Sequence, residues 1–171
     1  MMNGKIEAAL NGQIKTEAYS SQVYLSMACW AERNGYEGVS KFLYKHSDEE
    51  RMHMLKLVKF INERGGNAVI SEIDKPKSTY NSLEEVFKNL FEHETNVTNE
   101  INKIVHLCLQ EGDYTTHNFL QWYVNEQLEE EALARSILDK LKLIAGDKGG
   151  LYMFDRDISN ISVTSEANSQ G

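Results

Sequence analysis

The sequence is poor in residues that interrupt regular structure or mark extracellular folds. One proline and 11 glycines among 171 residues argue against collagen-like, linker-like and repetitive β architectures. The two cysteines, Cys29 and Cys108, stand far apart in the chain. They therefore form neither a disulfide framework nor a CxxC redox or zinc pair, and a reducing, cytoplasmic location is expected.

Long apolar runs and an excess of basic residues are also missing. No stretch is apolar for long enough to cross a membrane, and the first residues contain no apolar signal segment. The 18 Lys and Arg residues are outnumbered by 26 Asp and Glu, which gives a net charge of −8 and disfavours nucleic acid as a partner. An acidic chain is compatible with cations as partners. The length and the 41% hydrophobic content predict one folded domain.

Four long segments repeat apolar residues at steps of three and four, the period of an amphipathic helix. Glycines, the expected C-terminal stops, follow each of them. The predicted helices cover roughly residues 5–34, 38–64, 82–110 and 115–145. Ser82 and Glu85 have the spacing of a capping box at the start of the third helix.

The connections between these helices constrain the topology. Those after the first and third helices are short, so each pair forms an antiparallel hairpin. The connection over 67–81 is long enough to return along the bundle and to leave the second and third helices parallel. The predicted fold is therefore all-α, a four-helix bundle with one long crossover.

Polar residues interrupt each apolar stripe, and only near its middle. They are Glu17, His46, Glu50, His53, Glu94, Gln127 and Glu130. Glu17 lies as far before Gly35 as His53 lies after it, so the two are expected at one level of their hairpin. The same holds for Glu94 and Glu130 about the third turn. Several carboxylates gathered in a bundle core repel one another unless a cation lies among them.

The ligand types in this layer indicate a metal site. Glu50-Arg51-Met52-His53 places a carboxylate and an imidazole on one helix face. This Glu-x-x-His unit, with glutamates from neighbouring helices, is typical of di-iron and di-manganese bundles. Oxygen donors with one imidazole suit iron or manganese, and the lack of thiolates disfavours structural zinc. We expect Glu50 to bridge two ions.

Each of these residues also has an interpretation without a metal. A single Glu-x-x-His is common on solvated helix faces, but the coincidence of four helices at one depth outweighs that interpretation. We interpret His46 as a core histidine beside the site rather than a ligand. Tyr24 is expected to pack in the core and to hydrogen-bond a ligand, which makes it a candidate catalytic residue.

A second acidic set lies beside the first. Glu126, Glu129 and Glu130 share one face of the fourth helix, and Glu49 precedes Glu50 on the second. A solvated acidic face is the alternative for such a set. Because Glu130 belongs to the core layer, we expect a second, wetter cation site here.

Together these motifs resemble the bacterial non-haem ferritins of the ferritin-like di-iron carboxylate superfamily. The resemblance rests on Tyr19–Leu25 after Glu17, on His46–His53, on Glu94 and on Asn125–Glu131, and it covers about residues 1–160, the expected domain. It implies a ferroxidase centre that oxidises Fe(II) with dioxygen or hydrogen peroxide. It also implies a hollow shell of twenty-four subunits that stores ferric mineral, and a short fifth helix at about 148–158.

The resemblance also implies a role for each residue. Glu17, Glu50 and His53 would hold one iron, and Glu50, Glu94 and Glu130 the second. Gln127 would be a polar neighbour of the metals. The third iron site of the prokaryotic type would consist of Glu49, Glu126, Glu129 and Glu130.

Departures separate this chain from other branches of the superfamily. A bacterioferritin would repeat Glu-x-x-His where this chain has Gln127 and Glu130, and would carry its haem-ligating Met where Arg51 stands. Met52 lies one residue after the position of the haem-ligating Met, so no haem is expected. A rubrerythrin would need a cysteine module that two distant cysteines cannot supply. A di-iron peroxidase that retains little iron stays open as an alternative.

A third interpretation, of a different class, is a structural bundle whose polar layer only fixes helix register. Near the third turn, Asp113, Thr116, His117 and Gln121 lie where ferritins line three-fold channels. Because His117 is not the acid expected in a cation funnel, these residues do not predict a pore. The last residues, 161–171, are polar and are expected to be a disordered tail.

Overall fold

The computed structural model describes residues 2–161, which form five helices and no strand. The helices are α1 (Gly4–Arg33), α2 (Glu37–Glu63), α3 (Leu83–Glu111), α4 (Tyr114–Ile144) and α5 (Lys148–Ile158). The all-α bundle and the short fifth helix are thus confirmed. The predicted tail lies, apart from Ile161, outside the described residues. Among the described helices, none combines the length and apolarity needed to cross a bilayer.

Capping residues stand at the predicted ends of these helices. Asn3, Ser82, Asp113 and Asp147 accept hydrogen bonds from the first-turn amides of α1, α3, α4 and α5. Gly112 ends α3 in the left-handed region, with φ of 69°, where a glycine is favoured. At the capping box, Ser82 Oγ accepts from the Glu85 amide at 3.1 Å. Glu85 does not reach back to the Ser82 amide as expected, because its Oε2 accepts from the amide and side chain of Asn81.

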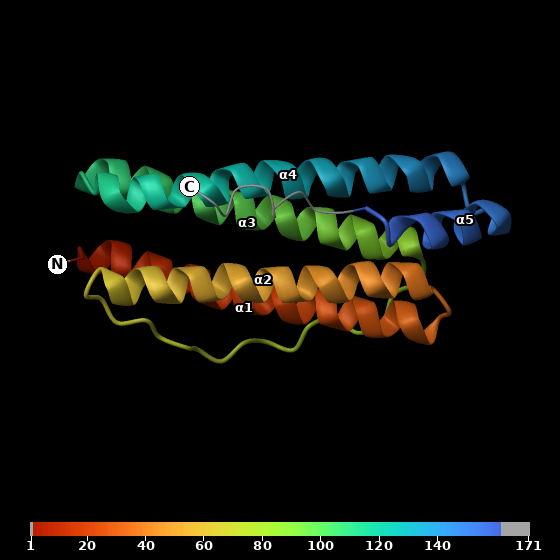
Figure 1. The fold of residues 1–171 in the computed structure, drawn as a ribbon, viewed down its shortest axis with the longest axis horizontal. Helices are drawn as coiled ribbons and strands as arrows, with labels where there is room; N and C mark the ends of the chain where they lie inside the picture. The colour runs from red at the N-terminus through yellow and green to blue at the C-terminus, as the bar shows by residue number, and fades with distance from the viewer. Residues whose placement is uncertain (1, 162–171) are drawn as a thin grey trace.

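The long connection runs beside the bundle from the end of α2 to the start of α3 (Figure 1). It is held to α1 by polar contacts along its length. The Val69 amide donates to Asn11 Oδ1 at 2.7 Å, and Ser26 Oγ donates to the Lys77 carbonyl at 2.7 Å. Tyr80 is buried where the connection ends. The chain therefore returns to the starting end of α2, and α2 and α3 run parallel, as predicted.

The apolar core has two separate parts. One comprises the second half of α1, the start of α2, the start of α3, the second half of α4 and α5. The other comprises the opposite halves of the four long helices. Between them lies a layer of buried polar side chains at mid-height, from Glu17 on α1 to Glu130 on α4. The polar layer therefore lies between two apolar regions of the core.

The fifth helix docks on the start of α2. The Val39 amide donates to Asp155 Oδ1 at 2.9 Å, whereas Tyr36, the residue before α2, provides no side-chain cap. A Cβ built on Gly38 would collide with the Asp155 carbonyl oxygen. A glycine at this position is therefore what allows the two helices to approach so closely.

Candidate metal centre

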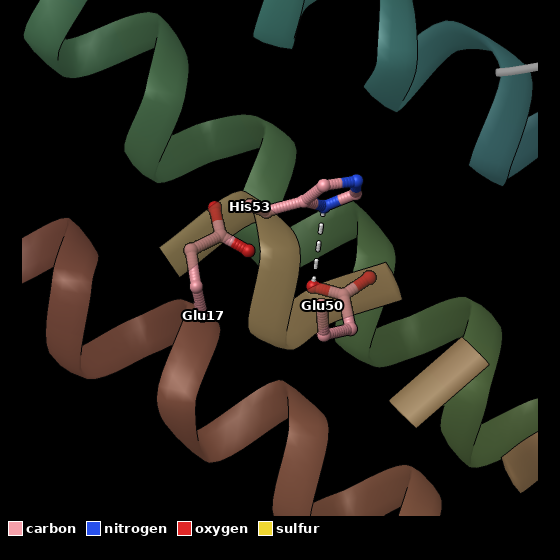
Figure 2. A group of neighbouring side chains, drawn as sticks. All are labelled: Glu17, Glu50 and His53. Atoms are coloured by element: carbon pink, nitrogen blue, oxygen red, sulfur yellow. Dashed lines mark ion pairs between the residues drawn. The ribbon is translucent and has the colours of Figure 1, made fainter. Parts of the chain in front are cut away.

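Glu17 on α1 and Glu50 and His53 on α2 form the first group of candidate ligands (Figure 2). One ligand atom from each lies within 4.8 Å of the others, and all three residues are buried. His53 Nδ1 is 3.6 Å from Glu50 Oε2, because i, i+3 spacing puts the two side chains on one helix face. The Glu-x-x-His unit of the sequence thus meets a carboxylate from the neighbouring helix of its hairpin.

The other hairpin contributes Glu94 on α3 and Gln127 and Glu130 on α4, all buried. Gln127 Nε2 donates to Glu94 Oε2 at 3.0 Å and to the Glu94 carbonyl at 3.2 Å. Gln127 thereby orients the Glu94 carboxylate. Glu130 Oε2 accepts from His46 Nε2 at 3.1 Å, so it links the two hairpins.

Burial and mutual repulsion disfavour the charged forms of these carboxyl groups. Burial, with the charge of Glu50, raises the pKa of Glu17 well above its ordinary value. Burial raises the pKa of Glu50 to about 8. Burial, followed by the charge of Glu130, raises the pKa of Glu94 well above its ordinary value. No Lys or Arg is buried anywhere in residues 2–161 to balance these acids.

Several buried oxygens of the layer have no hydrogen-bond partner. Within the described part of the chain, these carboxylate atoms are Glu17 Oε2, Glu49 Oε2, Glu94 Oε1 and Glu130 Oε1. Buried polar atoms are almost always satisfied, so a gathering of orphaned acceptors requires an explanation. A cation placed among the carboxylates would satisfy them and offset their repulsion. The residues present therefore fit a site for multivalent, oxygen-preferring metal ions.

A second candidate group consists of His46, Glu49 and Glu130, again with ligand atoms within 4.8 Å of one another. It overlaps the expected second acidic set only in part. Glu126 is buried beside the first group, with Oε1 3.8 Å from His53 Nε2. Glu129 belongs to neither group and is exposed. His46, interpreted from sequence as a core histidine beside the site, is buried and lies within this group.

Two supporting side chains escaped the sequence analysis. Gln13 is buried and donates from Nε2 to Glu17 Oε1 at 2.7 Å. Its position one turn before Glu17 on the same stripe was a usable signal. Tyr123 Oη donates to the His53 carbonyl at 2.7 Å, a backbone contact between α4 and α2 that the pattern alone does not reveal.

The expectation for Tyr24 is half right. The ring is fully buried, as predicted, but its hydroxyl has no partner among the described residues and does not bond a ligand. The rings of His46 and His93 stand edge-on to it, at centroid distances of 6.1 and 5.8 Å. Their Nε2 atoms pair with Glu130 and with Ser20 instead, so neither is available to the phenol.

An open pocket leads to the layer from the surface between α2 and α4. It has a volume of about 520 Å³, and Glu49, His53, Lys56 and Trp122 are among the residues that line it. Trp122 stands edge-on to His53 with ring centroids 5.1 Å apart, and Lys56 Nζ lies 3.8 Å over its ring. Two side chains of the candidate ligand groups, His53 and Glu49, thus border this pocket.

Comparison with known proteins agrees with this geometry. Residues 7–144 match the ferritin-like domain family. The chain is 46% identical over 162 residues to a "probable bacterial non-heme ferritin-like protein" of Haemophilus influenzae, covering 95% of this chain and 98% of that one. It is 42% identical over 164 residues to the "bacterial non-heme ferritin" of Campylobacter jejuni, covering 96% and 98%.

Solved structures extend the likeness to three dimensions. The open-pore ferritin of the hyperthermophilic archaeon Archaeoglobus fulgidus superposes with a TM-score of 0.92 at 42% identity, covering 94% of this chain and 98% of that one. The fold and the buried carboxylate–histidine layer define a ferritin-like helical bundle. By its sequence this chain belongs to the ferritin family, and its relatives in it include the bacterial non-haem ferritins.

Proposed function

We propose that the polar layer is a ferroxidase centre that oxidises Fe(II), its substrate, to Fe(III). Glu17, Glu50 and His53 hold one ion. Glu50, Glu94 and Glu130 hold a second, with Glu50 shared between them. The observation that carries the proposal is the set of orphaned, buried carboxylate oxygens in a layer with no buried Lys or Arg among the described residues.

The ligand set explains the direction of the chemistry. Carboxylates stabilise Fe(III) relative to Fe(II), which favours transfer of electrons from the bound pair to an oxidant. Two Fe(II) ions supply the two electrons that convert dioxygen to hydrogen peroxide, or hydrogen peroxide to water, with protons taken up by the reduced oxygen. Either oxidant satisfies the balance.

Binding of Fe(II) at the proposed ferroxidase centre releases a proton. Because burial raises the pKa of Glu50 to about 8, this carboxyl holds its proton near neutral pH when no cation is present. Ligation requires the ionised form, so Fe(II) binding displaces that proton. Gln13 and Gln127 keep Glu17 and Glu94 oriented during the exchange.

Oxidation kinetics test the centre directly. Fe(II) added in air to the parent protein should be oxidised rapidly, and the double variant Glu50→Ala, His53→Ala should lose that phase. The matched control is Glu92→Ala, His106→Ala, which removes the same residue types from exposed positions and should behave like the parent. Equal rates for both variants would instead support a bundle whose polar layer serves only structure.

We further propose that ferric product is stored inside a hollow shell of twenty-four subunits. The support is likeness to ferritins over nearly the whole chain. Such a shell of 19.6 kDa chains has a mass of about 470 kDa, which light scattering would measure. Iron that co-elutes with the shell on gel filtration indicates storage, whereas oxidation without retained iron indicates the alternative, a di-iron peroxidase.

We place the protein in the cytoplasm. Its two cysteines, Cys29 and Cys108, are both free, and Cys29 is exposed, which suits a reducing compartment. Fractionation of cells of the source organism would test this placement.

A further inference from the structure

Ser21 on α1 and Ser47 on α2 each bond the backbone of the other helix. Ser21 Oγ donates to the Ser47 carbonyl at 2.7 Å, and Ser47 Oγ donates to the Ser21 carbonyl at 2.7 Å. The two hydroxyl oxygens lie 3.2 Å apart, and both residues are buried. A reciprocal pair of hydrogen bonds therefore joins α1 to α2 in the interior of the bundle.

These bonds differ from the usual bonds of serines within helices. A helical serine commonly donates to a carbonyl of its own helix about one turn earlier. Ser20, the neighbour of Ser21, donates in this way to the Thr16 carbonyl at 3.1 Å. Ser40 on α2 also donates to a carbonyl of its own helix, at 3.0 Å. Because Ser21 and Ser47 bond across to the other helix, their hydroxyls restrain the position of α1 against α2.

The serine pair lies beside the first group of candidate ligands. Ser21 follows Glu17 by four residues on α1, so the two share a helix face. Ser47 precedes Glu50 by three residues on α2, with the same consequence. Glu17 points from α1 toward Glu50 and His53 on α2 (Figure 2). The spacing of these ligands depends on where α1 lies along α2, and the serine bonds act on that position about one turn away.

The geometry of the two bonds suits a restraint on register. Only one side-chain torsion separates a serine hydroxyl oxygen from the backbone, so each bond joins one helix backbone closely to the other. The bonds run in opposite directions, and a slide or rotation of α1 against α2 therefore distorts both of them. Glu17 and Glu50 are both buried acids that repel each other when ionised. The serine bonds oppose the separation of α1 and α2 that this repulsion favours.

We propose that Ser21 and Ser47 are positioning residues, which hold α1 in register with α2 and so fix Glu17 opposite Glu50 and His53. The inference rests on the proposed function, because it requires these three ligands to bind a metal ion. A binding site needs its ligands within about 0.5 Å of the productive geometry. Loss of the serine bonds should therefore weaken metal binding at this group more than at the candidate ligands on α3 and α4.

Zn(II) titration calorimetry of the whole protein tests the inference without redox chemistry. Ser21→Ala and Ser47→Ala should each weaken binding at the first group of candidate ligands by about 3-fold, because each variant keeps one of the two bonds. The double variant should weaken it by about 30-fold, more than the product of the two single effects. Ser40→Ala is the matched control. It removes a buried hydroxyl of α2 that bonds its own helix, and it should bind Zn(II) like the parent.

Anomalous diffraction from Zn(II)-soaked crystals separates this inference from the proposed function. We expect two metal peaks in the parent, and in the double variant a loss of occupancy at the peak beside Glu17. Unchanged affinity and occupancy in the double variant, even with a lower melting temperature, would overturn the positioning role alone. Absence of both peaks in the parent would contradict the proposed function as well. If the double variant does not fold, single variants that bind Zn(II) as tightly as Ser40→Ala would overturn the inference.

Discussion

Gln13 Nε2 donates a 2.7 Å hydrogen bond to Glu17 Oε1, one helical turn further along α1. The amide is buried, so this bond fixes the direction of a carboxylate whose other oxygen, Oε2, has no hydrogen-bond partner among the described residues. Gln127 does the same for Glu94 on the opposite hairpin. The two candidate ions are therefore flanked by a matched pair of orienting amides.

We expect Gln13→Leu to weaken divalent-metal binding at the Glu17–Glu50–His53 group by about 10- to 100-fold, the usual cost of losing an outer-shell partner. Zn(II) titration calorimetry measures it without redox chemistry. Thr16→Val is the control, because the Thr16 hydroxyl bonds only the Gly12 carbonyl on its own helix. Unchanged affinity in Gln13→Leu would show that Glu17 needs no orientation.

The metal-free protein should lose stability as pH rises from about 5 to 8. Burial raises the pKa of Glu17 and Glu94, and that of Glu50 to about 8, so the folded state keeps protons that the unfolded chain releases. Each such proton changes the free energy of unfolding by about 1.4 kcal/mol per pH unit. Denaturant unfolding with a chelator present measures this slope.

Saturating Zn(II) should oppose this pH dependence. Ligation needs ionised carboxylates, so metal binding, and the stability that it adds, increases with pH over the same window. Glu50→Gln should flatten the metal-free slope. A metal-free protein that is equally stable at pH 5.5 and 8 would mean that these carboxyl groups are already ionised in the fold.

Tyr24→Phe should leave the free energy of unfolding unchanged within about 0.5 kcal/mol, or raise it. The hydroxyl is buried without a partner, so its removal loses no hydrogen bond and ends a desolvation cost. Thermal unfolding checks the stability. A destabilised variant would show that the phenol is bonded in solution, and slower Fe(II) oxidation at unchanged stability would give it a catalytic role.

Gly38→Ala should separate α5 from the start of α2. The new methyl group would collide with the Asp155 backbone. Gly12→Ala is the control, because Gly12 is an exposed helical position with open space around it. This substitution should stabilise α1 by about 0.5–1 kcal/mol. Limited proteolysis within Lys148–Ile158 together with the melting temperature of both variants measures the difference. Equal resistance to cleavage would contradict the docking described for α5.

The sequence predicted most of the fold because each element carries its own signal. Glycine stops and three–four periodicity located all four long helices, and the length of 67–81 required the parallel return. Near the end of α2, however, Phe60 is only partly buried, and its neighbour Ile61 faces the core. One residue more or less around a helix is within what a periodic pattern resolves.

The site was predictable in residue types and depth but not in hydrogen bonding. Matched distances from the turns brought Glu17, Glu50 and His53 together. His46 approaches Glu49 through i, i+3 spacing on α2, but it faces Glu130 because of how α2 packs against α4, which sequence spacing within one helix does not contain. The sequence likewise does not reveal whether the Tyr24 hydroxyl has a hydrogen-bond partner, because that depends on which groups already bond the neighbouring side chains.

The central claim is that the buried carboxylates of four helices gather around a pair of iron ions. Iron-edge anomalous diffraction from crystals soaked anaerobically in Fe(II) tests it most directly. We predict two strong peaks, one contacting Glu17, Glu50 and His53 and the other contacting Glu50, Glu94 and Glu130. A map in which these side chains keep their positions with no iron between them, at Fe(II) levels that sustain rapid oxidation in solution, would contradict the account.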